Sequence, residues 1–235
     1  GNLQGAIFAA DGDSVRPVVS PGEPIANVPG AKVSAMITQK VNRRNDIFFG
    51  GSHQMPDGSY VEGLYVSRQG TVELVTDSCF DAGVGGAQAC IAPYAQEVIS
   101  FNDARQVAFL ALMTGPGVSD NTDESIWATD RNGELVMIAR TGDTLEISPG
   151  VEKTIYQLSF QSAFRTHDSY GYSDLRQFNN QGQLVFMATF TDGSWGLFLS
   201  NAVRIPEPGA GALLLTASLV AVFRRPHTRG KWMAD

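Results

Sequence analysis

Short apolar runs bounded by turn residues recur along most of the chain. Val107–Met113 and Leu184–Phe190 are nearly continuous in apolar character and rich in β-branched and aromatic residues. This composition favours strands, and continuous apolarity indicates burial on both faces. A further strand is expected before each of the three Asn residues described next, within Lys32–Gln39, Gln96–Phe101 and Thr154–Phe160. The pattern therefore predicts an all-β body.

These runs form a repeat. Asn42, Asn102 and Asn179 are each followed by an apolar residue five positions later and by a Phe seven positions later. A segment centred on an aromatic residue then follows, with an earlier copy at the start of the chain: Gly63–Val66, Ser125–Ala128, Gly196–Leu199 and Ala6–Ala9. A third element ends in a Gly-acid turn, and residues 18–30 align without gaps to residues 138–150. Internal similarity at this period indicates stacked supersecondary units.

We expect each repeat to fold as a four-stranded antiparallel sheet, in a β-propeller-like arrangement. The β-repeat body spans residues 1–203, with units near the following ranges: 5–30, 31–86, 95–150 and 154–200. The chain begins and ends inside a repeat. Unless the first and last partial sheets combine, we expect an incomplete arc with an unpaired strand edge.

Residues 204–229 have a different character from the body. The stiff tripeptide Pro206-Glu207-Pro208 leads into the uncharged run 209–223, and the basic residues Arg224 and Arg225 follow. As a hydrophobic helix, this run spans about 22 Å, which is short of the roughly 30 Å hydrocarbon core. Basic residues stay on the cytoplasmic side, which leaves the body outside. A plain membrane anchor and a buried helix are the alternatives, and a buried helix is disfavoured because the run has no polar face.

This tail resembles the PEP-CTERM sorting signal of Gram-negative bacteria, which is also known as the ice-binding protein C-terminal domain. Its three parts stand in the family's order, and only the extension 230–235 departs from it. The resemblance implies that an exosortase-type membrane peptidase cleaves near Pro206, Glu207 and Pro208. The precursor is then tethered to the inner membrane through residues 209–223, and the mature protein reaches the cell surface or the exopolysaccharide.

The body resembles the NxxGxVAF-type tandem repeats of bacterial surface proteins with variable C-terminal anchors. The similarity is strongest at Asn102–Phe109, at Ile126-Trp127 and at Ala139–Asp143. Only the copy that begins at Asn179 keeps the motif's Gly, because Asn45 and Arg105 stand there in the other two. We therefore expect the turn to differ in those copies. The resemblance implies a fold and supplies no catalytic residue.

Composition narrows the choice of partners. The net charge is −7, and basic residues gather at and beyond Arg204, so the body is more acidic than the whole chain. Nucleic acid is therefore excluded as an expected partner, because phosphate binding needs Lys and Arg. The sequence starts at Gly1 without Met or a signal peptide, and export requires such a peptide. We expect the natural N-terminus to lie upstream or to have been processed.

The two cysteines, Cys79 and Cys90, flank a Gly- and Ala-rich stretch. Such a loop closes readily as a disulfide, which fits an oxidising compartment. Two unpaired thiols are the alternative. A zinc site is not expected, since no His lies nearby to complete four ligands.

Few residues carry chemistry. We interpret His53 and His167 as solvated loop residues, and the acidic stretches Asp11–Asp13 and Asp120–Glu124 as hydrated turns in preference to calcium ligands. Glu23 and Asp143 recur at one repeat position, which indicates a role in capping the turn. An insertion unique to the last repeat forms a candidate binding loop, with these polar and aromatic residues: His167, Asp168, Tyr170, Tyr172 and Asp174.

The sequence thus predicts an exported, non-enzymatic protein of the surface or matrix, which needs no cofactor and binds exopolysaccharide or another surface protein through its loops. The alternative is an extracellular glycosidase or lyase on a propeller-like scaffold. A pair of carboxylates at glycosidase separation in one pocket would favour that alternative.

Overall fold

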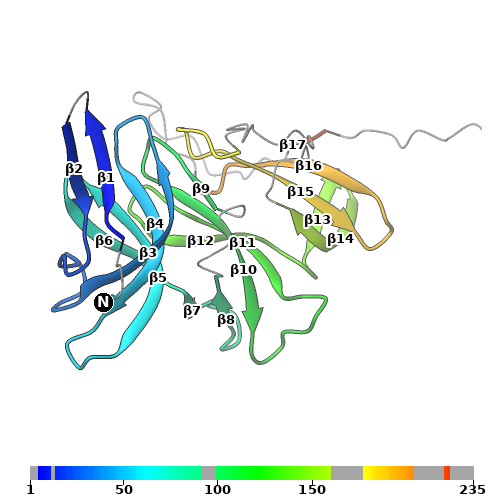
Figure 1. Ribbon diagram of the computed structural model, residues 1–235. Helices are drawn as coiled ribbons and strands as arrows, with labels where there is room; N and C mark the ends of the chain where they lie inside the picture. Colours follow the sequence, from blue (N-terminus) through cyan, green and yellow to red (C-terminus); the bar gives the residue numbers. More distant parts are fainter. Residues whose placement is uncertain (1–4, 12–13, 92–98, 160–176, 204–219, 223–235) are drawn as a thin grey trace, which may run out of the picture.

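The computed structural model describes residues 5–11, 14–91, 99–159, 177–203 and 220–222 (Figure 1). In this part of the chain the strands form four antiparallel sheets, one of which curls into a half-barrel. The all-β prediction is therefore confirmed. The described strands do not close into a propeller. None of the described residues belongs to a helix long and apolar enough to cross a membrane.

The first two sheets come from the N-terminal part of the chain. Among the described residues, sheet one consists of two strands. They are β1, Ile7–Asp11, and β2, Ser14–Val19. Sheet two has the order β3-β4-β5-β6, and its strands have these bounds: Lys32–Val41, Ile47–Gln54, Tyr60–Arg68 and Thr71–Asp77. Figure 1 shows them on the left, coloured from blue to cyan.

Sheet three has the order β12-β11-β10-β8-β7, with β9 also paired to β10. Its strands, from β7 to β12, are Cys79–Asp81, Gln88–Cys90, Ile99–Phe101, Val107–Thr114, Glu124–Thr129 and Leu135–Arg140. Sheet four runs β13-β14-β15-β16-β17, with these bounds: Thr144–Ser148, Val151–Ser159, Leu184–Phe190, Trp195–Ser200 and Val220–Val222. The two sheets occupy the centre and the right of Figure 1.

One unit recurs in sheets two, three and four. Each contains a strand before the Asn turn, the apolar strand after it, the aromatic-centred strand and a fourth strand. These series are β3-β4-β5-β6, β9-β10-β11-β12 and β14-β15-β16-β17, each joined by antiparallel pairing. The first strand of the cysteine hairpin, β7, lies within the predicted unit 31–86, and β8 lies just beyond it. The hairpin joins sheet three, because β8 pairs with β10 of the next unit.

The tail differs from the sequence expectation where it is described. Val220–Val222 lie within the run 209–223, and they form β17 on the edge of β16 instead of part of a helix. Strand pairing satisfies backbone hydrogen bonds on an otherwise open edge. β17 thereby takes the place that β6 and β12 hold beside β5 and β11.

The sheets stack face to face around three cores. Neighbouring residues in a strand point to opposite faces, so Phe49 packs with Tyr65 on one face of sheet two, whereas Phe48 packs with Phe109 of sheet three on the other. In sheet three, Ala108 likewise faces the core shared with sheet four. Sheets two and three are therefore buried on both faces, as the continuous apolar runs predict.

The Asn-led turn has the same backbone geometry in all three units. The third residue after each Asn has a positive φ, which is 59° at Asn45, 69° at Arg105 and 74° at Gly182. The Oδ1 of each Asn accepts a hydrogen bond from the backbone N–H four positions later, over 2.8–2.9 Å. The expectation that the turn differs where Gly is replaced is therefore wrong, because the side-chain bond fixes the loop.

Hydrogen bonds join these turns from one unit to the next. Asn42 Nδ2 donates to the carbonyl of Asn102 over 3.3 Å, and Asn102 Nδ2 donates to the carbonyl of Asn179 over 2.8 Å. Asn42 is 5% exposed and Asn102 is fully buried. We call the three residues the Asn ladder. It sets the register between successive units at their common edge.

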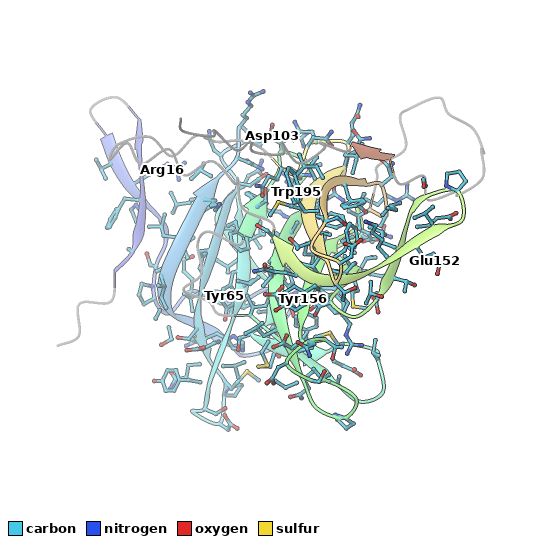
Figure 2. The ribbon with its side chains drawn as sticks, turned by 90° about the vertical axis from the view of Figure 1, so that its right-hand side faces the viewer. Arg16, Tyr65, Asp103, Glu152, Tyr156 and Trp195 are labelled. Atoms are coloured by element: carbon cyan, nitrogen blue, oxygen red, sulfur yellow. A yellow bond between two sulfur atoms is a disulfide. The ribbon has the colours of Figure 1, made fainter. Side chains whose placement is uncertain are left out.

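The next residue of each turn adds a second row of bonds. The Asp103 carboxylate accepts from the backbone N–H of Arg43, and Asn180 Oδ1 accepts from the backbone N–H of Asp103, each over 2.8 Å. Asn180 Nδ2 also donates to Asp103 Oδ2. In Figure 2 Asp103 is labelled near the upper edge of the sheets, away from Arg16 on the separate first sheet. Each unit thus caps the turn of the unit before it.

Candidate functional site: a cleft between sheets two and three

A cleft of about 370 Å³ opens where β5 and β6 of sheet two meet the turns of sheet three. Its lining includes the apolar residues Val66, Leu74 and Val107. Five charged residues line it, three of them arginines: Arg68, Glu73, Arg105, Asp130 and Arg131. A second cleft in the described part of the chain is smaller and measures about 190 Å³.

Two tight turns position the outer arginines. Arg68 ends β5, directly before the turn into β6, and its guanidinium lies 3.4 Å from the carboxylate of Glu73. Arg131 lies in the turn that joins β11 to β12. Asp130 fixes that turn, because its Oδ1 accepts hydrogen bonds from the backbone N–H groups of Asn132 and Glu134. Both carboxylates on the cleft are thus engaged by neighbouring groups.

Arg105 forms the third positive wall. Its Nε donates to Asp46 Oδ2 over 2.8 Å, and the Asp46 side chain is only 3% exposed. Burial alone would raise the pKa of Asp46, but hydrogen bonds from Arg105 and Asn42, with the charges of Arg105 and Arg68, hold that pKa below its usual value. The same contact raises the pKa of Arg105. The pair is therefore ionised at neutral pH and links the turns of two units.

Two arginines of the cleft have donor groups for which the described residues show no acceptor. Arg68 Nε is buried and has no hydrogen-bond partner in the structure. Arg131 is exposed, and it takes no part in an ion pair among the described residues. A buried guanidinium donor without an acceptor is costly. Chemically, the cleft is therefore suited to an acceptor that carries negative charge.

The disulfide lies outside the cleft. Cys79 and Cys90 are bonded, across the hairpin of β7 and β8. Neither of the chain's two cysteines is a free thiol. The prediction of a disulfide is confirmed, and this bond is consistent with an extracytoplasmic protein.

His53 is not the solvated loop residue that the sequence suggested. It lies within β4, is 1% exposed, and its Nδ1 is 2.7 Å from the hydroxyl of Tyr65. Burial lowers the pKa of His53 and raises that of Tyr65. The correction has a simple cause: β4 continues past its apolar run, so its later residues still face the core. Figure 2 shows Tyr65 within sheet two.

Two of the acidic residues that the sequence analysis considered, Glu23 and Glu124, accept hydrogen bonds from the backbone. In the smaller cleft, beside Asp120 and Tyr156, the Glu124 carboxylate accepts the backbone N–H of Leu158 over 2.9 Å. Glu23 caps its turn by accepting from Ser20 N–H, as predicted. No trio of His, Cys, Asp or Glu suited to a metal ion occurs within the described ranges.

Several predicted residues lie outside the described residues. They are Asp13, the loop residues His167, Asp168, Tyr170, Tyr172 and Asp174, and the tail residues Pro206, Glu207, Pro208, Arg224 and Arg225. The structure therefore does not place the candidate binding loop or the sorting motif.

Sequence reasoning missed the cleft and its arginines. Arg68 ends one aromatic-centred strand and Arg131 follows another, and polar residues are ordinary at such positions. One signal was present: Arg105 stands at the position that Gly182 occupies in the last unit, and an Arg there must accept a positive φ.

The chain was also compared with known proteins. The model of a family of unknown function, DUF7453, matches residues 1–212. No curated protein and no solved structure matches the chain.

Proposed function

The chain belongs to the DUF7453 family of unknown function, and on that premise we propose that it is an exported, non-enzymatic repeat protein of the cell surface or exopolysaccharide. The Cys79–Cys90 disulfide is the observation that carries the proposal. Disulfides persist in oxidising compartments and are rare in the cytosol. The proposed role is binding through the cleft and the loops between strands.

The stacking of the units supports a scaffold role. Three units share one strand order, and the Asn ladder joins their turns. We further propose that they form an arc of propeller type, of which β1 and β2 are the last two strands of another unit. Repeat arrays of this kind present extended surfaces and loops for binding.

Binding is favoured over hydrolysis by the state of the cleft carboxylates. Glycosidases need a carboxylic acid that is free to protonate the leaving group and a second carboxylate opposite it. Here Glu73 is paired with Arg68, and both oxygens of Asp130 accept hydrogen bonds within its turn. Neither group is thus free to act as a general acid, although both keep lone pairs that can accept further hydrogen bonds.

The sorting tail completes the proposal. By its resemblance to the PEP-CTERM signal, cleavage near Pro206-Glu207-Pro208 would release the body from the membrane. It would also remove β17 and leave the outer edge of β16 free. The mature protein would then have an open strand edge for contacts in the matrix.

Two measurements test this proposal. Thiol labelling of the unfolded, unreduced protein recovered from its native host is expected to find no free thiol. Intact-mass measurement of the surface-released protein is expected to show loss of the residues after about Pro208. Two labelled thiols would refute export, and a mature form that keeps Arg224 and Arg225 would refute processing.

A further inference from the structure

We propose that the cleft between sheets two and three binds the carboxylate of an acidic sugar, as it occurs in a uronate-containing polysaccharide. This inference rests on the proposed surface function and names the ligand class of that site. The body of the protein is acidic, so a cleft lined by three arginines and two acids is a local exception, although Arg68 and Arg105 are already paired with carboxylates.

The unused donors identify the complementary group. Arg68 Nε is buried without a partner, and the neighbouring Arg131 has no ion pair within the described residues. Guanidinium groups present a planar fork of donors that matches the two oxygens of a carboxylate. Nε itself is covered, but the Arg68 side chain is 37% exposed, so one carboxylate could lie between its outer guanidinium nitrogens and Arg131. It would also leave the Glu73 contact in place, because that contact uses only one of these nitrogens, Nη1.

The third arginine, Arg105, has an unfavourable backbone conformation. Arg105 has a φ of 69°, a conformation that Gly182 supplies without strain in the last unit. Strained positions cluster at functional sites because the surrounding structure must support them. Asp46 provides that support, and it holds the guanidinium of Arg105 against the wall of the cleft. The strain therefore serves to place a positive charge at this point.

The remaining lining favours a sugar over an acidic peptide. Glu73, Asp130 and Asn132 offer oxygens that accept hydrogen bonds from hydroxyl groups. A uronate carries one carboxylate among several hydroxyls, whereas a run of acidic side chains would bring further charges toward Glu73 and Asp130. The cleft volume of about 370 Å³ lies in the range of roughly 300–1,000 Å³ that is typical of small-molecule sites.

The test uses the purified, oxidised full chain. Titration calorimetry with oligogalacturonate is expected to show binding that weakens as salt is added, because the contact is ionic. The methyl ester of the same oligomer keeps the hydroxyls and removes the charge. It is expected to bind at least about tenfold more weakly, the effect of losing a charged hydrogen bond.

Matched variants locate the site. Arg131→Gln changes an exposed turn residue, and it is expected to weaken oligogalacturonate binding about tenfold with an unchanged melting temperature. Arg68→Gln is expected to weaken binding similarly, and its thermal melt shows whether the sheet is intact. Arg16→Gln, on the separate first sheet, removes the same charge from the surface and is expected to leave affinity unchanged.

Three outcomes would overturn the inference. They are no binding of oligogalacturonate by the oxidised chain, equal binding of its methyl ester, and full affinity in Arg131→Gln. Tighter binding of polyglutamate than of oligogalacturonate would also overturn the sugar assignment and identify an acidic peptide as ligand. Because these measurements use purified protein, they are independent of export and tail processing. A failure here therefore differs from a failure of the proposed function.

Discussion

Arg105 occupies a backbone position that another unit fills with glycine. A side chain in the left-handed region costs about 1 kcal/mol relative to glycine. The cost is offset by the contact with Asp46, whose carboxylate is almost fully buried. The Asn102 bond fixes the turn, and the partner in the neighbouring unit adds the contact that stabilises Arg105 in it.

Arg105→Gly is therefore expected to lower the free energy of unfolding, although it relieves the strained φ. Removal of one partner of a fully buried pair costs roughly 3–5 kcal/mol. Arg105 is 35% exposed, so solvent screening reduces that loss. After the strain relief, we expect a net loss of about 1 kcal/mol. Urea denaturation at pH 7 measures it.

A second substitution tests whether the stability lost in Arg105→Gly is due to the unpaired charge of Asp46. Asp46→Gln places at this position the residue type that Gln106 and Gln183 provide in the other units. In the Arg105→Gly background it is expected to restore stability, because no buried charge is then left unpaired. The folded-state pKa of Asp46 is lowered, so its stabilisation is full above about pH 4 and is lost as pH falls through the lowered pKa. A double variant less stable than Arg105→Gly would contradict this account.

His53 makes the protein sensitive to mild acid. Its pKa is lowered by burial, so the unfolded chain binds a proton more readily than the folded one. Stability from neutral His53 is full above the unfolded value of about 6.5, and it decreases as pH falls below that value. His53→Gln is expected to flatten the pH dependence of the melting temperature below about pH 6.5. An unchanged slope would mean that other groups cause the acid sensitivity.

At the scale of the element, the strand after each Asn turn is the part most readily predicted from sequence, whereas the geometry of the turn was predicted wrongly for two copies. The spacing from Asn to Phe gave the strand that follows, and Asn102–Phe109 folds as expected into a turn and β10. The bonds between turns were not predictable in this way. The acceptor for Asn102 Nδ2 is the carbonyl of Asn179 in a distant unit, and a backbone carbonyl leaves no sequence signature.

Asn102→Ala tests whether the ladder is important for stability. The substitution leaves the buried N–H of Gln106 without its acceptor. It also removes the bond to the carbonyl of Asn179, which keeps the N–H of Gly182 as a donor. Since a buried orphan costs about 1–3 kcal/mol and a lost hydrogen bond about 1 kcal/mol, we expect a loss of roughly 2–4 kcal/mol. Asn179→Ala is the matched control. Its side chain is only partly buried and, among the described residues, bonds only within its own turn. A smaller loss is therefore expected, and equal losses in urea denaturation would contradict a role for the ladder.

At the scale of the molecule, the first sheet has two strands among the described residues. Phe8 aligns with Tyr65, Trp127 and Phe198, which are at most 4% exposed, yet Phe8 is 60% exposed. Within the described ranges β1 pairs only with β2, so its other edge has no strand beside it. The first and last partial sheets thus do not combine. Exposed apolar edges promote association.

We therefore expect the chain to self-associate as concentration rises. Phe8→Ser is expected to reduce association by removing the largest apolar group of β1. Tyr60→Ser, which changes a similarly exposed aromatic in β5, is the control and should have little effect. Light scattering across a concentration series measures both. A monodisperse wild-type monomer would show that this edge is protected.

The sequence by itself determined the strands, the repeated unit and the cysteine pair, because alternation, turn chemistry and loop closure act over a few residues. Only the tertiary structure decided the rest. It buried His53, brought Arg105 to Asp46, and assembled the cleft from Arg68 of one unit and Arg131 of the next. It also paired β17 with β16, where the apolar run alone had suggested a helix. These contacts join residues that are far apart in sequence, and they depend on how the sheets stack, which no local pattern encodes.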